Sequence, residues 1–405
     1  MKILMISTDY PKKGSNIYTD LSVALKNRGH YIKVVVAEEK KKTEKTYLHK
    51  ERNIDVLRVK TGNMYEVGFI EKTLTFLNIS KDLKKEIKNY YGNEKFDLIL
   101  FHTPPVTLYK VIRWTMNYFS CKSYLMQKDI FPQNGVDLGL YSKLHPAYIY
   151  FRHEEKKLYK VSSIIGCMSN KNIEYLQDHN KYLPKEKFEL FPNTTFIEEK
   201  NINEKEKIKI RKKYNISEND IVATFGGNFG KPQGLSFLLK VIEEYKNKEN
   251  LKFLLIGRGT EKKKVFDYIK ENNIQNVLMY DFLPKEDYEI LLDVCDIGLI
   301  FLDKRFTIPN FPSKTLSYFS CKIPIMAAID NNTDYGQMLQ ESKSGFWCLN
   351  GDIKMYKSKF DKLLNDKKLR KQMGINGFNY LKDNYDVNYS VNILEKYEKE
   401  VCDKV

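Results

Sequence analysis

The sequence predicts an α/β protein with two doubly wound parallel sheets, and two observations carry that prediction. The chain opens with an apolar strand, a helical pattern that Gly29 stops and a second apolar strand, at residues 2–6, 17–28 and 31–37. This order is typical of the start of a parallel sheet. A second series of the same kind begins at Ile221. Because 405 residues suffice for two cores, we expect one domain over 1–193 and another over 194–375.

The first domain continues the alternation of strands and helices. Apolar runs of strand length recur at 54–59, 96–101, 123–126, 164–168 and 187–190. Helical spacing of apolar residues follows at 71–90, from Val106 onward and at 170–179. The lysine-rich segment 40–52 has no clear period, and we therefore expect an exposed loop there.

The second domain follows a polar linker at 193–206 and a helix that ends near Tyr214. Its strands are predicted at 221–225, 253–256, 277–280, 297–300 and 323–328. Helices are predicted from about Gln233, at 285–294 and from near Pro312. We expect the last long helix, about 376–404, to pack back on the first domain.

The composition excludes several classes of protein. No apolar run approaches the ~20 residues that cross a bilayer, and Thr8-Asp9 ends the opening run before a signal peptide could form, so we expect a cytoplasmic protein. Six scattered cysteines predict neither a disulfide framework nor a zinc site. The net charge of +16 suits a nucleic acid, an anionic membrane surface or a phosphate-bearing substrate. Because the lysines are spread over many helices and no nucleic-acid-binding motif occurs, a membrane surface ranks above a nucleic acid.

An anion site is predicted at Pro312-Ser313-Lys314, between two buried-strand runs. Proline fits the first turn of a helix, where its missing N–H costs nothing. A helix that starts after a parallel strand presents free N–H groups and a positive dipole end, and Lys314 adds a full charge. The alternative is a surface loop with a solvated lysine.

A glycine-rich loop is predicted at Gly226 to Lys231, after the first strand of the second domain. Pro232 stands where a nucleotide triphosphatase loop needs a Ser or Thr for magnesium, so that class is excluded. The loop remains suited to a diphosphate held by backbone N–H groups. Gly257-Arg258-Gly259 is predicted to form a tight turn. No Asp-x-Asp occurs in the sequence, and we therefore expect no metal site.

Two features of the first domain are candidates for chemistry. His102 ends a strand beside Pro104-Pro105, at the edge where ligands bind in such sheets, although a structural histidine is the alternative. The loop Gln127 to Gly139 follows a central strand and is rich in polar side chains, which makes it a second candidate.

These motifs together resemble glycosyltransferase family 4, whose members have the GT-B fold. The family's order is kept by RGH, FPN, GGNFGKPQGL, LLIGRGTEK and FPSKTLSYFSCKIPI, at 28–30, 191–193, 226–235, 254–262 and 311–325. HTPPVTL and KDIFPQNGVDLG also resemble the branch that builds O-antigen, capsule and colanic-acid repeat units, including N-acetylfucosaminyl transferases. The ordered set covers essentially the whole chain.

The resemblance implies two Rossmann-like domains that face each other across a cleft. It also implies the retaining transfer of a hexosyl or N-acetylhexosaminyl group from a nucleotide sugar, usually a UDP-sugar, to a lipid-linked saccharide. The protein would work as a peripheral enzyme at the inner face of the plasma membrane, with an anionic membrane surface as a partner. Neither a cofactor nor a metal nor a nucleic acid is expected.

The resemblance also assigns roles to residues. Lys231 and Lys314 would neutralise the donor diphosphate with the N–H groups near Ser313, while Arg258 and Phe282 would flank the base. Further substrate-binding positions are Gly14, Ser15, Asn16, Gly227, Asn228, Gln233 and Ser317. Lys128 occupies the position of the family's catalytic-site histidine, and it joins Asp129 and His102 as the catalytic candidates.

Some positions depart from the family pattern. Two glutamates of many members correspond to Pro309 and Ser317, and the phosphate-binding Arg and Lys of the glycine loop correspond to Asn228 and Gln233. These departures keep two alternatives open. The first is a non-catalytic relative that binds a nucleotide or a partner transferase, and the second is a nucleotide-sugar epimerase of the same architecture.

Overall fold

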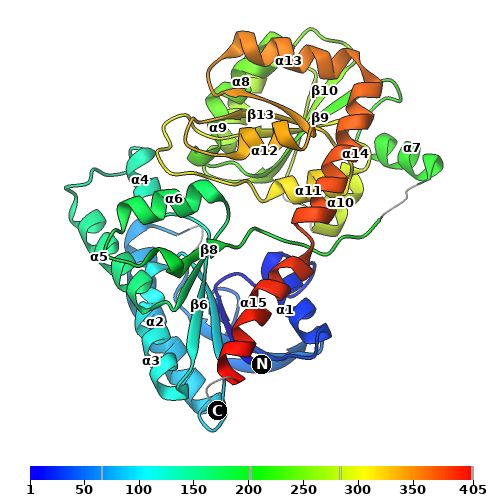
Figure 1. The fold of residues 1–405 in the computed structure, drawn as a ribbon. Helices are drawn as coiled ribbons and strands as arrows, with labels where there is room; N and C mark the ends of the chain where they lie inside the picture. Colours follow the sequence, from blue (N-terminus) through cyan, green and yellow to red (C-terminus); the bar gives the residue numbers. More distant parts are fainter. Residues whose placement is uncertain (65–66, 200–202, 282, 284, 403–405) are drawn as a thin grey trace. The chain divides into compact units, whose positions relative to one another are not determined.

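The chain folds into two compact units in a computed structural model (Figure 1). The structure describes residues 1–64, 67–199, 203–281, 283 and 285–402. One unit comprises Met1–Thr195 and Val387–Val405, and the other comprises Phe196–Asp386. The boundary lies two residues beyond the predicted one, and the chain returns to the first unit at Val387. Within the described ranges, no helix is long and apolar enough to cross a membrane.

The first unit is built on an eight-stranded sheet in the order β3-β4-β2-β1-β5-β6-β7-β8. Its strands are β1 (Lys2–Ser7), β2 (Tyr31–Glu39), β3 (Tyr47–Glu51), β4 (Ile54–Thr61), β5 (Leu98–Thr103), β6 (Lys122–Gln127), β7 (Ile164–Cys167) and β8 (Phe188–Leu190). All neighbours run parallel except β3 with β4. The carboxyl ends of the parallel strands therefore meet at one edge, where ligands bind in sheets of this kind.

Helices cover both sides of this sheet. They are α1 (Ile17–Asn27), α2 (Phe69–Tyr91), the 3₁₀ turn η1 (Val106–Leu108), α3 (Tyr109–Phe119), α4 (Gln133–Asp137), α5 (Pro146–Val161), α6 (Asn170–His179), the turn η2 (Lys185–Lys187) and α15 (Val387–Cys402). α2, α3 and α5 lie on one side, and α1 and α15 lie together on the other (Figure 1). Val387, Val391 and Leu394 of α15 are buried in the core of the first unit.

Two predictions about this unit were wrong in part. The segment 40–52 is not wholly a loop, because residues 47–51 form β3, an antiparallel edge strand. An edge strand that is exposed on both faces carries no apolar alternation, so its sequence pattern is weak. The predicted helix at 376–404 is two helices, and its first part belongs to the second unit.

The second unit is built on a six-stranded parallel sheet in the order β11-β10-β9-β12-β13-β14. Its strands are β9 (Ile221–Asn228), β10 (Leu251–Arg258), β11 (Val277–Tyr280), β12 (Ile297–Phe301), β13 (Ile325–Ile329) and β14 (Gly345–Leu349). Its helices are α7 (Glu204–Lys213), the 3₁₀ turn η3 (Lys231–Gln233), α8 (Leu235–Glu244), α9 (Lys262–Glu271), α10 (Lys285–Leu292), α11 (Lys314–Ser320), α12 (Tyr335–Glu341), α13 (Ile353–Asn365) and α14 (Lys367–Asn384). The predicted order of strands and helices is confirmed, with α12 and β14 added between β13 and α13.

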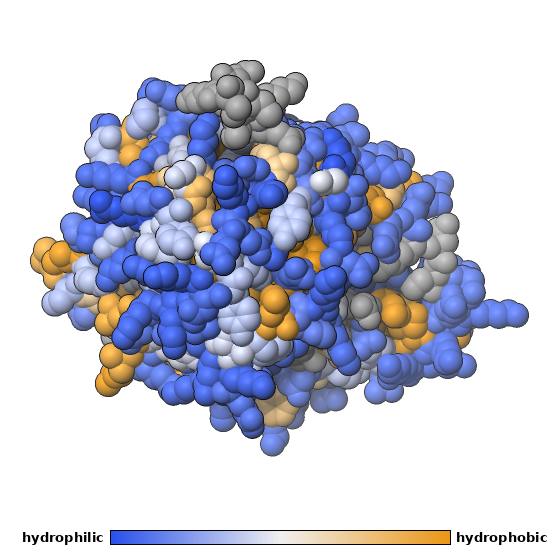
Figure 2. All heavy atoms as spheres, turned by 90° about the horizontal axis from the view of Figure 1, so that it is seen from below, coloured by the Kyte–Doolittle hydropathy of each residue, from blue (hydrophilic) through white to orange (hydrophobic). Residues whose placement is uncertain are grey.

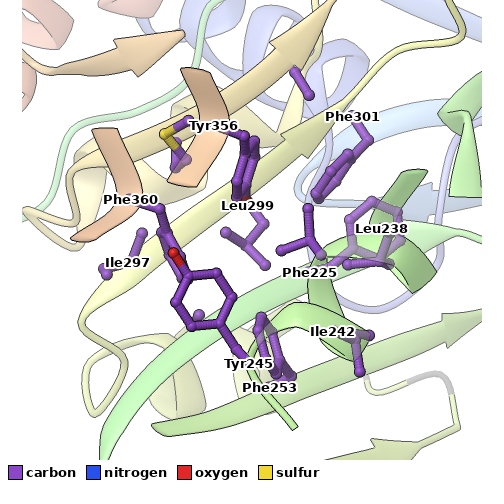
Figure 3. Packing of buried hydrophobic residues seen from close by; sticks show 14 of the residues in the cluster. Phe225, Leu238, Ile242, Tyr245, Phe253, Ile297, Leu299, Phe301, Tyr356 and Phe360 are labelled. Atoms are coloured by element: carbon purple, nitrogen blue, oxygen red, sulfur yellow. The ribbon is translucent and has the colours of Figure 1, made fainter. Parts of the chain in front are cut away.

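Aromatic side chains fill the core between this sheet and the helices α8 and α13. Figure 3 shows Phe225, Phe253 and Phe301 of the sheet packed against Tyr356 and Phe360 of α13. Each of these side chains is fully buried, and a buried side chain of this size stabilises a fold by about 1.5–3 kcal/mol. The core therefore fixes β9 and β12, from whose carboxyl ends the candidate site extends.

Candidate functional site

Lys314 is the best-defined charged group at the carboxyl edge of the second sheet. It is the first residue of α11, and its Nζ donates a hydrogen bond to Gln233 Oε1 at 2.8 Å. The same nitrogen lies 4.1 Å from the centroid of the Phe225 ring. Burial lowers the pKa of Lys314 to about 7, because a buried amine loses the water that stabilises its charge. The full charge expected from the sequence is therefore only partly present near neutral pH.

The turn before α11 offers fewer free donors than the sequence suggests. The N–H of Thr315 donates to Pro312 O and the N–H of Leu316 donates to Ser313 O. The Ser313 side chain caps no N–H of the helix. Much of the positive character of this turn must therefore come from Lys314 itself.

The glycine-rich segment is partly strand, which differs from the predicted loop. β9 continues through Gly226 and Gly227 to Asn228, and Gly227 lies opposite Gly257 of β10. A Cβ on Gly257 would lie 1.8 Å from Gly227 O, and Gly257 has φ +145°, so only glycine fits there. The glycines thus allow the two strands to approach closely, and Gly227 leaves open space beside the Lys314 side chain, whose Cε is 4.0 Å from a Cβ built there.

Lys231 lies at the start of η3 and lines a shallow hollow of about 220 Å³. The hollow is also lined by Glu261, Lys264, Asp303 and Arg305. η3 carries both Lys231 and Gln233, the partner of Lys314, so the turn links the two lysines. Lys314 is not among the residues that line the hollow, and the convergence of both ammonium groups on one diphosphate stays a prediction.

The other donor-site candidates of this unit lie around the same edge. Arg258 ends β10 opposite Asn228, and both residues are exposed. Ser317 is half-buried on the first turn of α11. Phe282, predicted to flank a base, falls outside the described residues.

In the first unit, Lys128 follows β6 and donates a hydrogen bond from Nζ to Asn193 Oδ1 at 2.6 Å. Asn193 in turn donates to Met168 Sδ at 3.5 Å. Burial lowers the pKa of Lys128 to about 7. The ammonium group is therefore held by a neutral amide and is poorly solvated, which favours an anionic ligand.

Asp129 is exposed next to Lys128, yet the two side chains form no ion pair in the part of the chain that the structure describes. Its carbonyl accepts hydrogen bonds from Phe131 N–H at 3.1 Å and from Gln127 Nε2 at 2.9 Å. These bonds fix the loop around Asp129. Loss of hydration raises the pKa of the Asp129 carboxyl above its ordinary value, and the nearby Lys128 partly opposes that shift.

His102 faces inward. Its Nε2 accepts the N–H of Thr8 at 3.1 Å and lies 3.0 Å from Ser7 Oγ, and its ring stacks on Tyr18 at 4.2 Å. Burial lowers the pKa of His102 to about 3, with Lys128 as a smaller cause, so the ring is neutral at any working pH. This geometry favours the structural alternative, in which His102 positions the loop after β1.

The segment Gly14, Ser15 and Asn16 precedes α1. Asn16 forms a capping box with Thr19, in which its own N–H donates to Thr19 Oγ1 at 2.7 Å. Gly14 has φ +71°, and its carbonyl accepts a hydrogen bond from Arg52. The N–H of Asn16 is therefore already used, and any contact to a phosphate would come from its two predecessors.

The sequence analysis did not identify two residues that contact the candidate lysines. Asn193 holds Lys128, and Phe225 forms the face against which Lys314 lies. Asn193 is the last residue of the FPN segment, which follows β8, and the rule that ligands bind at the carboxyl ends of strands could have identified it. Phe225 reads as an ordinary core residue, so no sequence signal marks it. Within the described residues no group of three His, Cys, Asp or Glu could hold a metal ion.

Comparison with known proteins supports the interpretation of the second unit as a glycosyltransferase domain. Residues 206–380 match the family model described as Glycosyl transferases group 1. This segment contains Phe225, Gln233 and Lys314, so the candidate site residues of the second unit lie inside the matched region, whereas those of the first unit lie outside it.

Relatives and solved structures extend the likeness to the whole chain. A probable glycosyltransferase, WbjE of Pseudomonas aeruginosa, is 26% identical over 261 residues, which span 62% of each chain. The N-acetyl-alpha-D-glucosaminyl L-malate synthase of Bacillus anthracis is 22% identical over 92% of this chain and 91% of its own. The structure of Anabaena Alr3699/HepE in complex with UDP-glucose superposes with a TM-score of 0.72 at 16% identity and covers 100% of both chains.

Three findings lead to one conclusion: the two parallel-sheet units, the match of residues 206–380 to the group 1 glycosyltransferases, and a relative described as a probable glycosyltransferase. The protein is a glycosyltransferase of the GT-B architecture.

Proposed function

We propose that the protein transfers a hexosyl or N-acetylhexosaminyl group from a UDP-sugar to a lipid-linked saccharide, with retention of the anomeric configuration. The observation that carries the proposal is Lys314, held by Gln233 and the Phe225 ring beside Gly227. A buried amine with a pKa of about 7 suits an anionic ligand, because the ligand restores the charge that burial disfavours. The UDP-glucose in the similar Anabaena structure supports the choice of nucleotide.

In this transfer one bond forms and one bond breaks at the anomeric carbon of the donor sugar. The oxygen of the acceptor hydroxyl forms a bond to the anomeric carbon, and the bond from that carbon to the diphosphate breaks. The diphosphate leaves with the electron pair, and the hydroxyl proton passes to the leaving group. We assign Lys314 and Lys231 to the departing diphosphate, and Asp129 to the acceptor hydroxyl or the donor sugar. The Lys128 ammonium group would bind a phosphate of the donor or of the lipid carrier.

We also propose a biological setting, the assembly of a bacterial surface polysaccharide such as capsule or O-antigen at the inner face of the plasma membrane. The net charge of +16 is suited to an anionic leaflet. HTPPVTL and KDIFPQNGVDLG resemble the transferase branch that builds such repeat units. The acceptor would then be a saccharide on a lipid carrier.

A non-catalytic relative that binds a nucleotide is the second candidate. Ser317 replaces the glutamate that holds the donor ribose in many members of the resembled family, and Gln233 replaces a phosphate-binding lysine. In this structure, however, Gln233 accepts a hydrogen bond from Lys314, so a lysine still reaches this edge from the neighbouring helix. An epimerase of the same architecture is less favoured, because the first unit resembles the transferase branch.

Mass spectrometry of lipid-linked saccharides tests the proposal. The protein is incubated with the saccharide extract and, in turn, with each member of a panel of nucleotide sugars. A product one sugar heavier, formed with release of UDP, is the expected result. Isomerisation of the donor without transfer would support the epimerase. Binding of the nucleotide without any reaction over the whole panel would support the non-catalytic relative.

A further inference from the structure

We infer that the outer faces of α2 and α5 dock on an anionic lipid bilayer, with Leu and Ile side chains inserted at the carboxyl edge of the first sheet and lysines lying along the leaflet. The inference rests on the proposed function, because it names the surface through which this unit would meet a lipid-linked acceptor. It requires nothing of the second unit.

The outer face of α2 has two different halves. Ile70, Leu74 and Leu77 occupy successive turns of one face and are 76%, 54% and 39% exposed. The same face continues with four exposed lysines, at positions 81, 84, 85 and 88. The opposite face holds Ile79, Leu83 and Ile87, which are fully buried. α2 is therefore anchored by its inner face, while Ile70, Leu74 and Leu77 remain exposed on the outer face.

The outer face of α5 repeats this arrangement. Leu144, just before the helix, is 86% exposed, and Ile149 in its first turn is 58% exposed. His153, Lys156 and Lys160 then follow Ile149 on one face at helical spacing, and all three are exposed. Both helices thus place apolar side chains at the N-terminal end of the outer face and cations toward the other end.

The apolar ends of both helices lie at the same edge of the sheet. α2 follows β4 and α5 follows β6, so each helix starts at the carboxyl edge of a parallel sheet. The two helices lie on one side of that sheet (Figure 1). Lys128 and Asp129 follow β6 at this same edge. Insertion of the apolar ends would therefore bring the membrane interface to the loop that carries the acceptor-site candidates.

The charge on these faces is complementary to an anionic surface. On α5 the two acidic residues Glu154 and Glu155 are buried and bonded to Lys157 and Arg152, so they do not offset the outer cations. An amphipathic surface with Leu or Ile beside Lys binds anionic lipid through shallow apolar burial and charge together. On the face drawn in Figure 2, hydrophobic side chains stand in small groups among hydrophilic ones.

Vesicle sedimentation measures the docking directly. The full chain should bind vesicles that contain phosphatidylglycerol and should not bind pure phosphatidylcholine. Binding should weaken as salt rises from about 0.01 M to about 1 M, which shortens the screening length from about 30 to about 3 Å. The triple variant Lys81→Gln, Lys85→Gln, Lys88→Gln should bind about fivefold less per lysine, on the order of 100-fold in total.

Matched variants distinguish binding through this surface from binding caused by net charge or by exposed apolar area elsewhere. Lys367→Gln, Lys368→Gln, Lys371→Gln removes the same charge from exposed positions of α14 in the other unit and should bind nearly as the parent. Leu74→Gln with Leu144→Gln should weaken binding about tenfold, whereas Phe266→Gln, which is 53% exposed in α9, should not. Equal losses in the α2 and α14 triples would overturn the proposal.

A tryptophan reporter locates the contact. The added tryptophan fluorescence of Leu144→Trp should be quenched by brominated lipid in vesicles, and that of Phe266→Trp should not. If the parent binds no vesicles but sediments as a dimer that Leu74→Gln with Leu144→Gln dissociates, the surface is an interface between copies and the proposal is wrong. Vesicle binding requires no donor, so it can succeed when sugar transfer fails, and transfer to an acceptor can succeed when vesicle binding fails.

Discussion

Burial decides which of the candidate side chains carry charge in this protein. Lys128 and Lys314 both have a pKa lowered to about 7, and each is held by an amide oxygen and lies near an aromatic ring. An amine in this state is poised to gain a proton when an anion arrives. The sequence shows that both residues are lysines. It does not show their burial or their partners, because Asn193 and Gln233 are distant in the sequence and are brought close only by folding.

We expect His102 to stabilise the fold without taking part in proton transfer. His102→Ala leaves the buried N–H of Thr8 without an acceptor, which should lower the free energy of unfolding by about 1–3 kcal/mol. His102→Gln should cost less, since its amide oxygen can accept the same bond. Urea denaturation of the three proteins measures both differences.

The pH dependence gives the same experiment a second readout. The pKa of His102 falls from 6.5 to about 3 on folding, so as the pH is lowered the unfolded chain takes up this proton at a higher pH than the folded chain. The stability that this histidine contributes should therefore be lost as the pH falls from about 6.5 toward 3. Both variants should show a shallower loss of stability over that range. An identical slope in the parent and His102→Gln would contradict this role.

Asp129 is the residue from which we expect the largest effect on turnover. Asp129→Asn keeps the shape and removes the charge, and it should lower kcat by on the order of 10²-fold or more while donor binding stays nearly intact. Steady-state kinetics and UDP titration measure the two quantities. Asp178→Asn, at an exposed position of α6, is the matched control. Parent-like turnover in Asp129→Asn would assign the residue to the structure of its loop.

At the level of elements, the close parallel pairing of β9 and β10 sets the shape of the carboxyl edge of the second sheet. Gly227 and Gly257 face each other with φ +118° and +145°. The sequence identified both glycines but placed the first in a loop, because glycine is typical of turns and a paired glycine strand has no distinctive pattern.

These two glycines should differ in their tolerance of a methyl group. Gly257→Ala places Cβ 1.8 Å from Gly227 O, a backbone atom, whereas Gly227→Ala meets only the end of Lys314 at 4.0 Å. Gly227→Ala should therefore cost only the backbone strain, about 1–3 kcal/mol, and Gly257→Ala should cost clearly more. Chemical denaturation measures both. Equal losses would mean that the strands separate without cost.

At the scale of the whole molecule, the chain changes unit at residues 385–387. Tyr385 leaves α14 with φ −130° and packs on Phe311 of the second unit, whereas Val387 is fully buried in the first. The sequence predicted one continuous helix here, since the residues on both sides of the break have helical spacing. The turn is fixed by tertiary contacts, which a local pattern cannot show.

The order of strands and helices could be predicted well because parallel strands are apolar and helices keep a regular period. The candidate site could be predicted only in part. Lys314 and Lys128 follow strands of both sheets and are visible as such, while the inward direction of His102 and the use of the Asn16 N–H in a cap depend on contacts that only the fold supplies. The assignment of Lys314 to the donor diphosphate is the claim on which the proposed function depends.

Calorimetric titration of UDP tests that claim most directly. The parent should bind UDP with uptake of protons above pH 7, because the diphosphate raises the pKa of Lys314 from about 7, and its affinity should fall as the pH rises further. Lys314→Met should weaken binding by about 1.5–3 kcal/mol and abolish this proton uptake, and Lys231→Met should weaken binding by a similar amount. Lys367→Met, at an exposed site on α14, should bind like the parent. Parent-like affinity and proton uptake in Lys314→Met would contradict the account and place the donor site elsewhere.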